Sequence, residues 1–195
     1  MTAKQYFDAY AQFAINAGER FNVNPAVILA ISSYETGYAS SYSARNDKNF
    51  FGLSASSYFN SEFWNGTDKR ATTDSAGSFR VYTSVQNSFY DFAWLLSTAS
   101  RYKSAFNASY NITLFADEFA KSGYFTGNQA NYKNAIISRS KTFLTYLKDI
   151  SAVVTGTGSG GTGTGSGGTG SSSSNAIAWA VGLLGLGALL KKRNS

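Results

Sequence analysis

Residues 26–57 read AVILAISSYETGYASSYSARNDKNFFGLSASS. The apolar run at the start follows Asn24-Pro25, a pair typical of a helix start, because Asn caps the first turn and Pro fits the first helical position. Gly37 is a typical residue just past a helix end. The pattern therefore predicts a buried helix that ends near Glu35.

Glu35 is the candidate catalytic residue of this helix. It lies seven positions after Ile28 and four after Ile31, so it shares their inward-facing side. Burial and the negative end of the helix dipole both disfavour a carboxylate, and both raise its pKa. A carboxyl group that stays protonated near neutral pH can act as a general acid. The structural alternative is a buried carboxylate paired with Arg45 or another cation.

Helical spacing of apolar residues continues on both sides of this stretch. It predicts further helices over residues 3–18 (closed by Gly18), 85–100, 112–122 and 130–150. Residues 53–84 differ, because they are rich in Ser, Thr, Gly, Asn and aromatics. Within them, Phe79-Arg80-Val81-Tyr82 alternates like a strand. The expected fold is α+β and mainly helical, with one irregular, β-rich insertion.

The composition excludes several kinds of catalyst. The 195 residues include no Cys and no His. Thiolate nucleophiles, Ser-His-Asp and Cys-His machinery, and metal sites built on Cys or His are therefore excluded. Proton transfer must come from carboxylates, Tyr or Lys. We expect no metal and no cofactor.

The chain divides into three parts. Residues 1–154 have the composition of one globular domain. Residues 155–174 read TGTGSGGTGTGSGGTGSSSS, which is typical of a flexible linker. Residues 175–195 contain the apolar run 176–190, AIAWAVGLLGLGALL, followed by the basic residues KKR.

The run 176–190 predicts a C-terminal membrane helix. It is somewhat shorter than the ~20 residues of a standard span, but Lys191 and Lys192 can snorkel and extend it. Its leucines surround the helix axis instead of forming one stripe, which disfavours the alternative of a helix docked on protein. The basic end places KKR in the cytoplasm and the domain on the other side of the membrane, facing the cell wall.

The charge argues against a nucleic-acid partner. Fourteen of the 17 Lys and Arg residues lie in residues 1–154 with all 11 Asp and Glu residues, so this part carries a net charge of +3 with interspersed signs. The other three positive charges are the KKR at the end of the apolar run. The oligomeric state has no signature in the sequence.

Several motifs occur in the order found in one enzyme family. They are Glu35-Thr36-Gly37, the small-residue stretch Ala39 to Ala44, Asn49-Phe50-Phe51-Gly52, Trp64-Asn65-Gly66, Thr72-Thr73-Asp74, Phe79-Arg80-Val81-Tyr82, Arg101-Tyr102, and Gly123-Tyr124 with Tyr132. Over residues 8–148 the chain thus resembles the glucosaminidase family (glycoside hydrolase family 73), which includes the flagellar-rod peptidoglycan hydrolase domain. Thr36 replaces the usual Ser. Residues 125–129, FTGNQ, replace the Ala-Thr-Asp-Pro that often follows the late Tyr.

The resemblance implies a lysozyme-like fold with a helical lobe, a small β-lobe and a cleft between them. It also implies cleavage of β-1,4 bonds in the peptidoglycan glycan strand, with Glu35 as general acid. Asp74 stands at the family's second acidic position, followed as candidates by Glu62 and Asp68. In a single-acid mechanism, the 2-acetamido group of the sugar or an intramolecular attack replaces the second carboxylate.

The resemblance also implies further site residues. Tyr124 matches the family's active-site tyrosine. Asn49 and Tyr132 occupy motif positions expected to contact substrate, and Phe51, Trp64 and Tyr82 are expected to line a saccharide groove, since aromatic rings stack on sugars. The structural alternative for each ring is a place in the core.

The expected function is a membrane-tethered peptidoglycan hydrolase, an endo-β-N-acetylglucosaminidase. The alternatives are a muramidase or lytic transglycosylase of the same fold, and a non-catalytic cell-wall-binding module. The first residues, MTAKQYFDAYAQFA, lack the apolar run of a signal peptide. This favours a bacteriophage lytic enzyme, held in a virion or host membrane, over a bacterial envelope enzyme.

Overall fold

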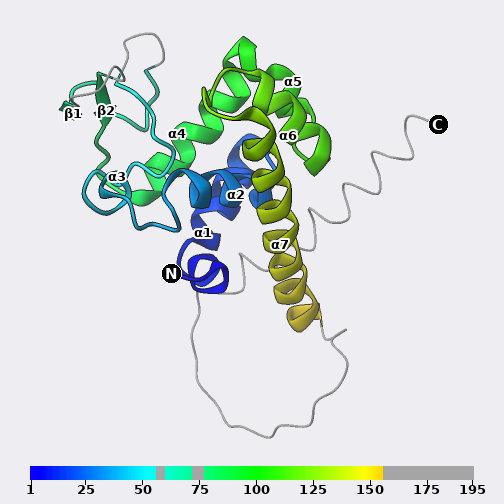
Figure 1. Cartoon of the computed structure of the whole chain (residues 1–195). Helices are drawn as coiled ribbons and strands as arrows, with labels where there is room; N and C mark the ends of the chain where they lie inside the picture. The colour runs from blue at the N-terminus through cyan, green and yellow to red at the C-terminus, as the bar shows by residue number, and fades with distance from the viewer. Residues whose placement is uncertain (56–59, 72–76, 156–195) are drawn as a thin grey trace, which may run out of the picture. The chain divides into compact units, whose positions relative to one another are not determined.

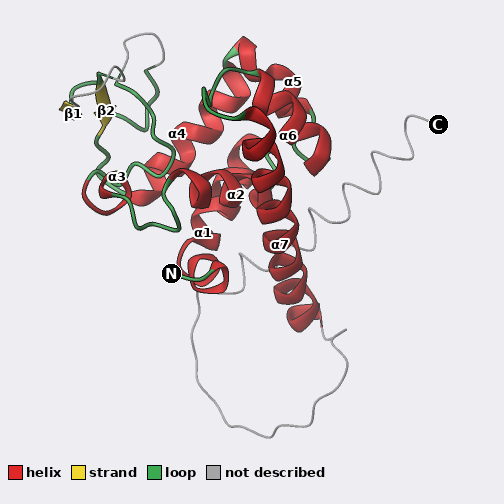
Figure 2. Ribbon diagram, in the orientation of Figure 1, coloured by secondary structure: helices red, strands yellow, loops and turns green. Residues whose placement is uncertain are grey.

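The computed structural model describes residues 1–55, 60–71 and 77–155. Helices dominate it (Figures 1 and 2). The elements in chain order are α1 (Ala3–Phe21), α2 (Pro25–Glu35), α3 (Tyr42–Asn46), β1 (Lys69–Ala71), β2 (Ser78–Arg80), α4 (Val85–Thr98), the 3-10 turn η1 (Ser100–Tyr102), α5 (Lys103–Asn107), α6 (Ile112–Lys121) and α7 (Gln129–Thr155).

Residues Met1–Phe143 form one compact unit, and Leu144–Ser195 form a second. All of the elements before α7 belong to the first unit, and α7 begins in it. The described part of the second unit is the remainder of α7, which extends beyond the predicted end at residue 150 to Thr155.

Helix α1 passes through the residue predicted to end it. The prediction of a helix over 3–18 is wrong at its end, because the helix runs to Phe21 and is capped by left-handed Asn22. Gly18 is needed for another reason. A Cβ there would lie 2.5 Å from the carbonyl oxygen of Val23, so only glycine allows the chain leaving α1 to pass this close.

Helix α2 is the buried centre of the unit. It begins as predicted, with the Asn24 side chain accepting a hydrogen bond from the Ala26 N–H at 2.9 Å and Pro25 in the first turn. Its residues from Ala26 to Ile31 are all fully buried, and α1 packs against it and against α4. Because α2 is buried from Pro25 to Ser33, its last residue, Glu35, is held in a fixed place beside the core.

The insertion contains the β-structure. Strands β1 and β2 pair antiparallel, with Arg70 opposite Phe79, and Ser54 forms an isolated bridge to Phe79. The predicted strand over 79–82 is thus displaced, since β2 covers 78–80. In Figure 1 the two strands lie at one end of the unit, away from α5 and α6. The expected mainly helical α+β architecture with a small sheet is confirmed.

Helices α4 and α6 follow the predicted periodicity, with ends that come earlier than predicted. Helix α4 stops at Thr98, and the chain continues into η1 and α5. Helix α6 stops at Lys121. The short elements α3, η1 and α5 were not predicted. They have five residues or fewer, too few to show an apolar period.

Within the described ranges, none of the helices has the length and apolar character needed to cross a bilayer. The predicted anchor, 176–190, and the linker from residue 156 onward lie outside these ranges.

Candidate active site

A pocket of about 260 Å³ opens beside the end of α2. The loop after Asn49, strand β2, the end of α4 and η1 form its other walls. Its lining residues are Glu35, Phe51, Gly52, Leu53, Ser54, Arg80, Leu95, Arg101, Tyr102 and Tyr124. All of them belong to the first compact unit.

Glu35 lies in this pocket as the last residue of α2. Burial raises the pKa of its carboxyl group from 4.5 to about 7, and the hydrogen bond from Tyr132 opposes this rise. The predicted upward shift of this pKa is thus confirmed. Arg45 is exposed, and no ion pair joins it to Glu35 among the described residues. The structural alternative of a buried ion pair is therefore wrong.

The backbone after Glu35 turns sharply and is held in place. Gly37, Tyr38 and Ala39 have positive φ values of 54°, 57° and 62°, a conformation that non-glycine residues rarely adopt. The Thr36 hydroxyl donates to the Ser32 carbonyl at 2.6 Å and accepts from the Ala39 N–H at 2.9 Å. Thr36 thus fixes the turn that ends α2 and so the position of Glu35.

Tyr132 of α7 controls the acid directly. Its hydroxyl donates to Glu35 Oε1 at 2.9 Å, and its ring is buried. Phe125 stacks on this ring at a centroid distance of 4.3 Å, and Tyr34 meets it edge-on at 4.9 Å. Tyr132 was predicted to contact substrate, whereas the structure makes it the hydrogen-bond partner of the acid.

The loop that departs from the family pattern supports Tyr132. Phe125 takes the place of the usual Ala and supplies the stacking ring. Gly127 lies directly against that ring, since a Cβ there would be 2.6 Å from a Phe125 ring carbon. The replacement sequence of residues 125–129 therefore has a structural role beside the acid.

Tyr124 lies in the same pocket. Its hydroxyl donates to the Phe51 carbonyl, and its ring packs against Phe119 at 4.9 Å and Phe92 at 5.9 Å. Burial raises the pKa of the phenol, and so does the nearby charge of Glu35. Tyr124 is therefore a protonated phenol close to the acid, where sequence reasoning expected it.

Asn49 is placed differently from its prediction as a substrate contact. Its side chain is fully buried. Its amide donates to the carbonyls of Leu53 at 2.9 Å and Arg80 at 3.1 Å, and its oxygen accepts from the Leu53 N–H at 3.0 Å. Because these bonds occupy the amide, Asn49 shapes the pocket wall and joins it to β2.

The three rings expected in a saccharide groove are core residues. Phe51, Trp64 and Tyr82 are at most 5% exposed. Phe51 stacks on Phe92 at 4.2 Å with an interplanar angle of 2°. Burial of these rings stabilises the fold instead of presenting a face to sugar.

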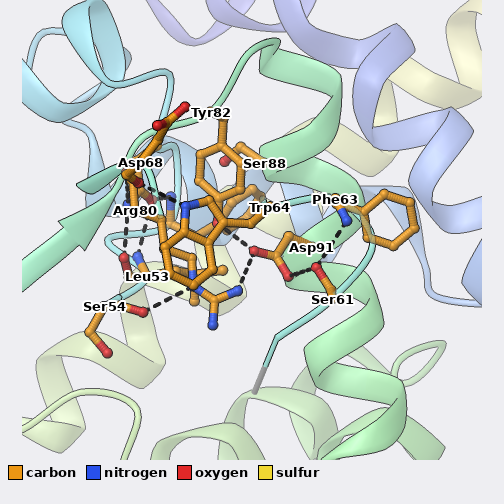
Figure 3. Close-up of polar contacts among 12 residues, drawn as sticks. Leu53, Ser54, Ser61, Phe63, Trp64, Asp68, Arg80, Tyr82, Ser88 and Asp91 are labelled. Atoms are coloured by element: carbon orange, nitrogen blue, oxygen red, sulfur yellow. Dashed lines mark hydrogen bonds and ion pairs between the residues drawn. The ribbon is translucent and has the colours of Figure 1, made fainter. Parts of the chain in front are cut away.

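Trp64 and Tyr82 belong to a polar cluster around Asp91 (Figure 3). The fully buried Asp91 carboxylate pairs with Arg80 at 2.7 Å and accepts from the Tyr82 hydroxyl at 2.6 Å. The Arg80 guanidinium lies 4.5 Å from the Trp64 ring centroid. This cluster joins the insertion to α4, a role that was not predicted for any of these residues.

The structure places none of the described candidates for a second carboxylate in the pocket. Asp74 lies outside the described residues. Glu62 pairs with Arg20 at 2.7 Å, and the Asp68 side chain accepts from Asn65 at 2.8 Å. Neither Glu62 nor Asp68 lines the pocket, in which Glu35 is the one carboxylate among the described residues. The described residues also hold no group of acidic side chains that could bind a metal.

Comparison with known proteins agrees with this geometry. The family model Glucosaminidase, described as mannosyl-glycoprotein endo-beta-N-acetylglucosaminidase, matches residues 11–144. The peptidoglycan hydrolase FlgJ of Pseudomonas aeruginosa is 30% identical in an alignment of 151 residues, which covers 71% of this chain and 36% of that protein. The chain thus spans about a third of the length of this relative.

Solved structures share the fold. The glycoside hydrolase domain of Salmonella typhimurium FlgJ matches with a TM-score of 0.58 at 21% identity, covering 80% of this chain and 98% of that domain. A peptidoglycan hydrolase from Sphingomonas sp. A1 matches with a TM-score of 0.57 at 20% identity, covering 83% of this chain and 99% of that chain. These similarities show that the expected lysozyme-like architecture is the one present.

Proposed function

The chain belongs to the glucosaminidase family of glycoside hydrolases, and from this membership we propose that it cleaves β-1,4 bonds in the glycan of peptidoglycan. Within that activity we propose an endo-β-N-acetylglucosaminidase with Glu35 as general acid. Support for the substrate comes from the peptidoglycan hydrolases that resemble the chain in sequence and fold.

The state of Glu35 is the single observation that carries this proposal. A general acid must hold its proton at the working pH and release it to the glycosidic oxygen as the bond breaks. With its pKa raised to about 7 by burial, Glu35 is about half protonated at neutral pH. It also lies in an open pocket. Its bond to the Tyr132 hydroxyl leaves the second carboxyl oxygen to carry the proton toward the substrate.

We propose Asp74 as the second carboxylate, which activates water or stabilises the developing positive charge on the sugar. The alternative is participation of the 2-acetamido group of the sugar, which needs no second carboxylate. Asp74→Asn distinguishes the two. A loss of two or more orders of magnitude in kcat supports Asp74, and a loss below about fivefold supports the acetamido route.

The proposed activity is tested with Glu35→Gln, which keeps the shape of the side chain but has no acidic proton to transfer. We expect the wild-type protein to clear cell-wall gels and the variant to fold but not clear them. Full clearing by the variant would remove Glu35 from the mechanism. Absence of clearing by the wild-type protein, together with retained binding to cell walls, would favour the non-catalytic binding module.

The products identify the bond that is cut. Mass spectrometry of the digested glycan should find a reducing N-acetylglucosamine end. A reducing muramic acid end would identify a muramidase instead, and anhydromuramic ends alone would identify a lytic transglycosylase.

We also propose that residues 176–190 tether the enzyme to a membrane through the Gly/Ser/Thr linker, with the catalytic domain facing the cell wall. The uncharged apolar run and the KKR that follows it support this proposal. A bacteriophage lytic enzyme is the setting that we favour. Fractionation of expressing cells, with protease protection of the two ends, tests the topology.

A further inference from the structure

Two arginines line the pocket, and their charges are in different situations. Arg80 is 4% exposed and is neutralised by the buried Asp91 carboxylate at 2.7 Å (Figure 3). Its guanidinium also donates to the Ser54 carbonyl at 3.0 Å. Arg80 is therefore committed to the fold, and its charge contributes little to the pocket.

Arg101 is exposed and has no carboxylate partner among the described residues. The pKa of Glu35 is set by burial and by Tyr132, with no contribution from Arg101. The positive charge of Arg101 is thus neither neutralised by a carboxylate among the described residues nor one of the causes of the raised pKa of Glu35. When Glu35 carries its proton, Arg101 is the uncompensated charge among the described lining residues.

The Arg101 guanidinium is nevertheless held in one place. It donates to the hydroxyl of Tyr102 and lies 4.6 Å from the centroid of that ring. Tyr102 is itself fixed, because it is 2% exposed and packs against Phe119 and Tyr124. A guanidinium has five N–H donors in a rigid fork that matches a carboxylate. One donor is used by the neutral phenol, and the others are available.

We infer that Arg101 binds a carboxylate of the substrate, and so selects glycans that carry muramic acid over neutral N-acetylglucosamine polymers. This inference rests on the proposed function for its substrate. The carboxylate is either the lactyl group of muramic acid, free where the peptide has been removed, or an acidic group of the stem peptide. Fixed orientation by Tyr102 reduces the entropy lost when the pair forms.

The test measures binding in the Glu35→Gln background, so that no ligand is consumed. Three ligands are compared by calorimetry: intact muropeptide strands, glycan strands freed of peptide by an amidase, and the same freed strands after chemical reduction of the lactyl carboxyl to an alcohol. Each ligand is titrated into the Glu35→Gln protein with Arg101 intact, and into the same protein carrying Arg101→Gln, Arg101→Lys or the matched control Lys103→Gln. Lys103 is exposed, lies two residues away and does not line the pocket.

We expect Arg101→Gln to weaken binding of at least one carboxylate-bearing ligand about tenfold. Arg101→Lys should lose less, and Lys103→Gln should lose nothing beyond twofold. Binding of the reduced strands should be the same with and without Arg101. A loss on freed strands assigns the lactyl carboxylate, and a loss confined to intact strands assigns the stem peptide. Thermal melting confirms that each variant is folded.

An equal loss on the reduced strands would overturn the inference, because Arg101 would then shape the pocket without contacting a carboxylate. Unchanged or unmeasurable binding of both carboxylate-bearing ligands would overturn it as well. Hydrolysis is not measured in this experiment. An inactive enzyme that shows the Arg101 dependence would therefore contradict the proposed function and leave this inference standing.

Discussion

At the scale of single residues, the pair formed by Glu35 and Tyr132 connects structure to chemistry. Burial raises the pKa of the acid to about 7, and the phenol hydroxyl opposes that rise by donating a hydrogen bond to the carboxylate. The two effects have opposite signs, so changing either partner moves the pKa in a predictable direction.

Tyr132→Phe should raise the pKa of Glu35 above 7, because it removes the one bond that favours the charged form. Activity requires the protonated acid, so the limb at which kcat/KM falls with rising pH should move to higher pH. The measurement is a pH profile of kcat/KM. Tyr124→Phe is the control, since it changes a phenol in the same pocket but leaves the bond to Glu35 intact, and its limb should not move. A limb that moves to lower pH in Tyr132→Phe would contradict the assignment.

Glu35 should also make folding stability depend on pH. Its pKa is 4.5 in a freely exposed state and about 7 when folded, so the folded chain binds the extra proton between these values. The contribution of Glu35 to the free energy of unfolding is therefore fully present below pH 4.5 and is lost as the pH rises through 7. This contribution is at most about 3 kcal/mol. Glu35→Gln should remove this decline. Urea unfolding at pH 5 and pH 8 measures it, and an equal change in both proteins would refute the prediction.

At the scale of elements, the Asp91 cluster fastens the insertion to α4. Asp91 is fully buried and accepts hydrogen bonds from Arg80, Tyr82 and Ser61. Arg80 belongs to β2 and Ser61 to the loop before β1, so one carboxylate holds two parts of the insertion. The wall of the pocket that includes Arg80 and Ser54 depends on this attachment.

Asp91→Asn should destabilise the protein by about 3 kcal/mol, because it leaves the buried Arg80 without its counter-charge. The midpoint of urea unfolding measures the loss. Asp8→Asn is the matched control, since the ion pair of Asp8 with Lys4 is more than half exposed and such pairs contribute little. Similar midpoints for both variants would show that the Arg80–Asp91 pair does not hold the insertion.

The sequence predicted those elements whose signals are local. Asn24-Pro25 and Gly37 bracket α2 within a few positions, and the apolar period places Glu35 on its buried side. The partner of Glu35 was not predicted, because Tyr132 is 97 residues away and no local pattern joins them. Trp64 and Tyr82 show why the role of an aromatic residue could not be predicted from the sequence. A ring that fills a core and a ring that stacks on sugar have the same sequence signature.

At the scale of the whole molecule, the chain combines a +3 domain with a tail that carries the other three positive charges. Helix α7 continues to Thr155, so a truncation that removes the linker and the apolar run should end at that residue.

A chain that stops after Thr155 should fold, keep its hydrolytic rate on soluble glycan and lose its attachment to membranes. It retains every described residue of the pocket. The measurements are kcat/KM on soluble fragments and flotation with lipid vesicles, compared with the full chain. Vesicle binding by the truncated chain would contradict the proposed tether, and loss of activity with the fold intact would assign the tail a role in catalysis.

The distance along the chain between Glu35 and Tyr132 bears on how the enzyme is synthesised. Glu35 emerges from the ribosome early, whereas the Tyr132 hydroxyl that donates to its carboxyl group comes 97 residues later. Until the domain has folded, water surrounds the carboxyl group, which then titrates as an ordinary glutamate and is ionised at neutral pH. A chain that ends before α7 thus lacks the raised pKa of Glu35 on which the proposed hydrolysis depends.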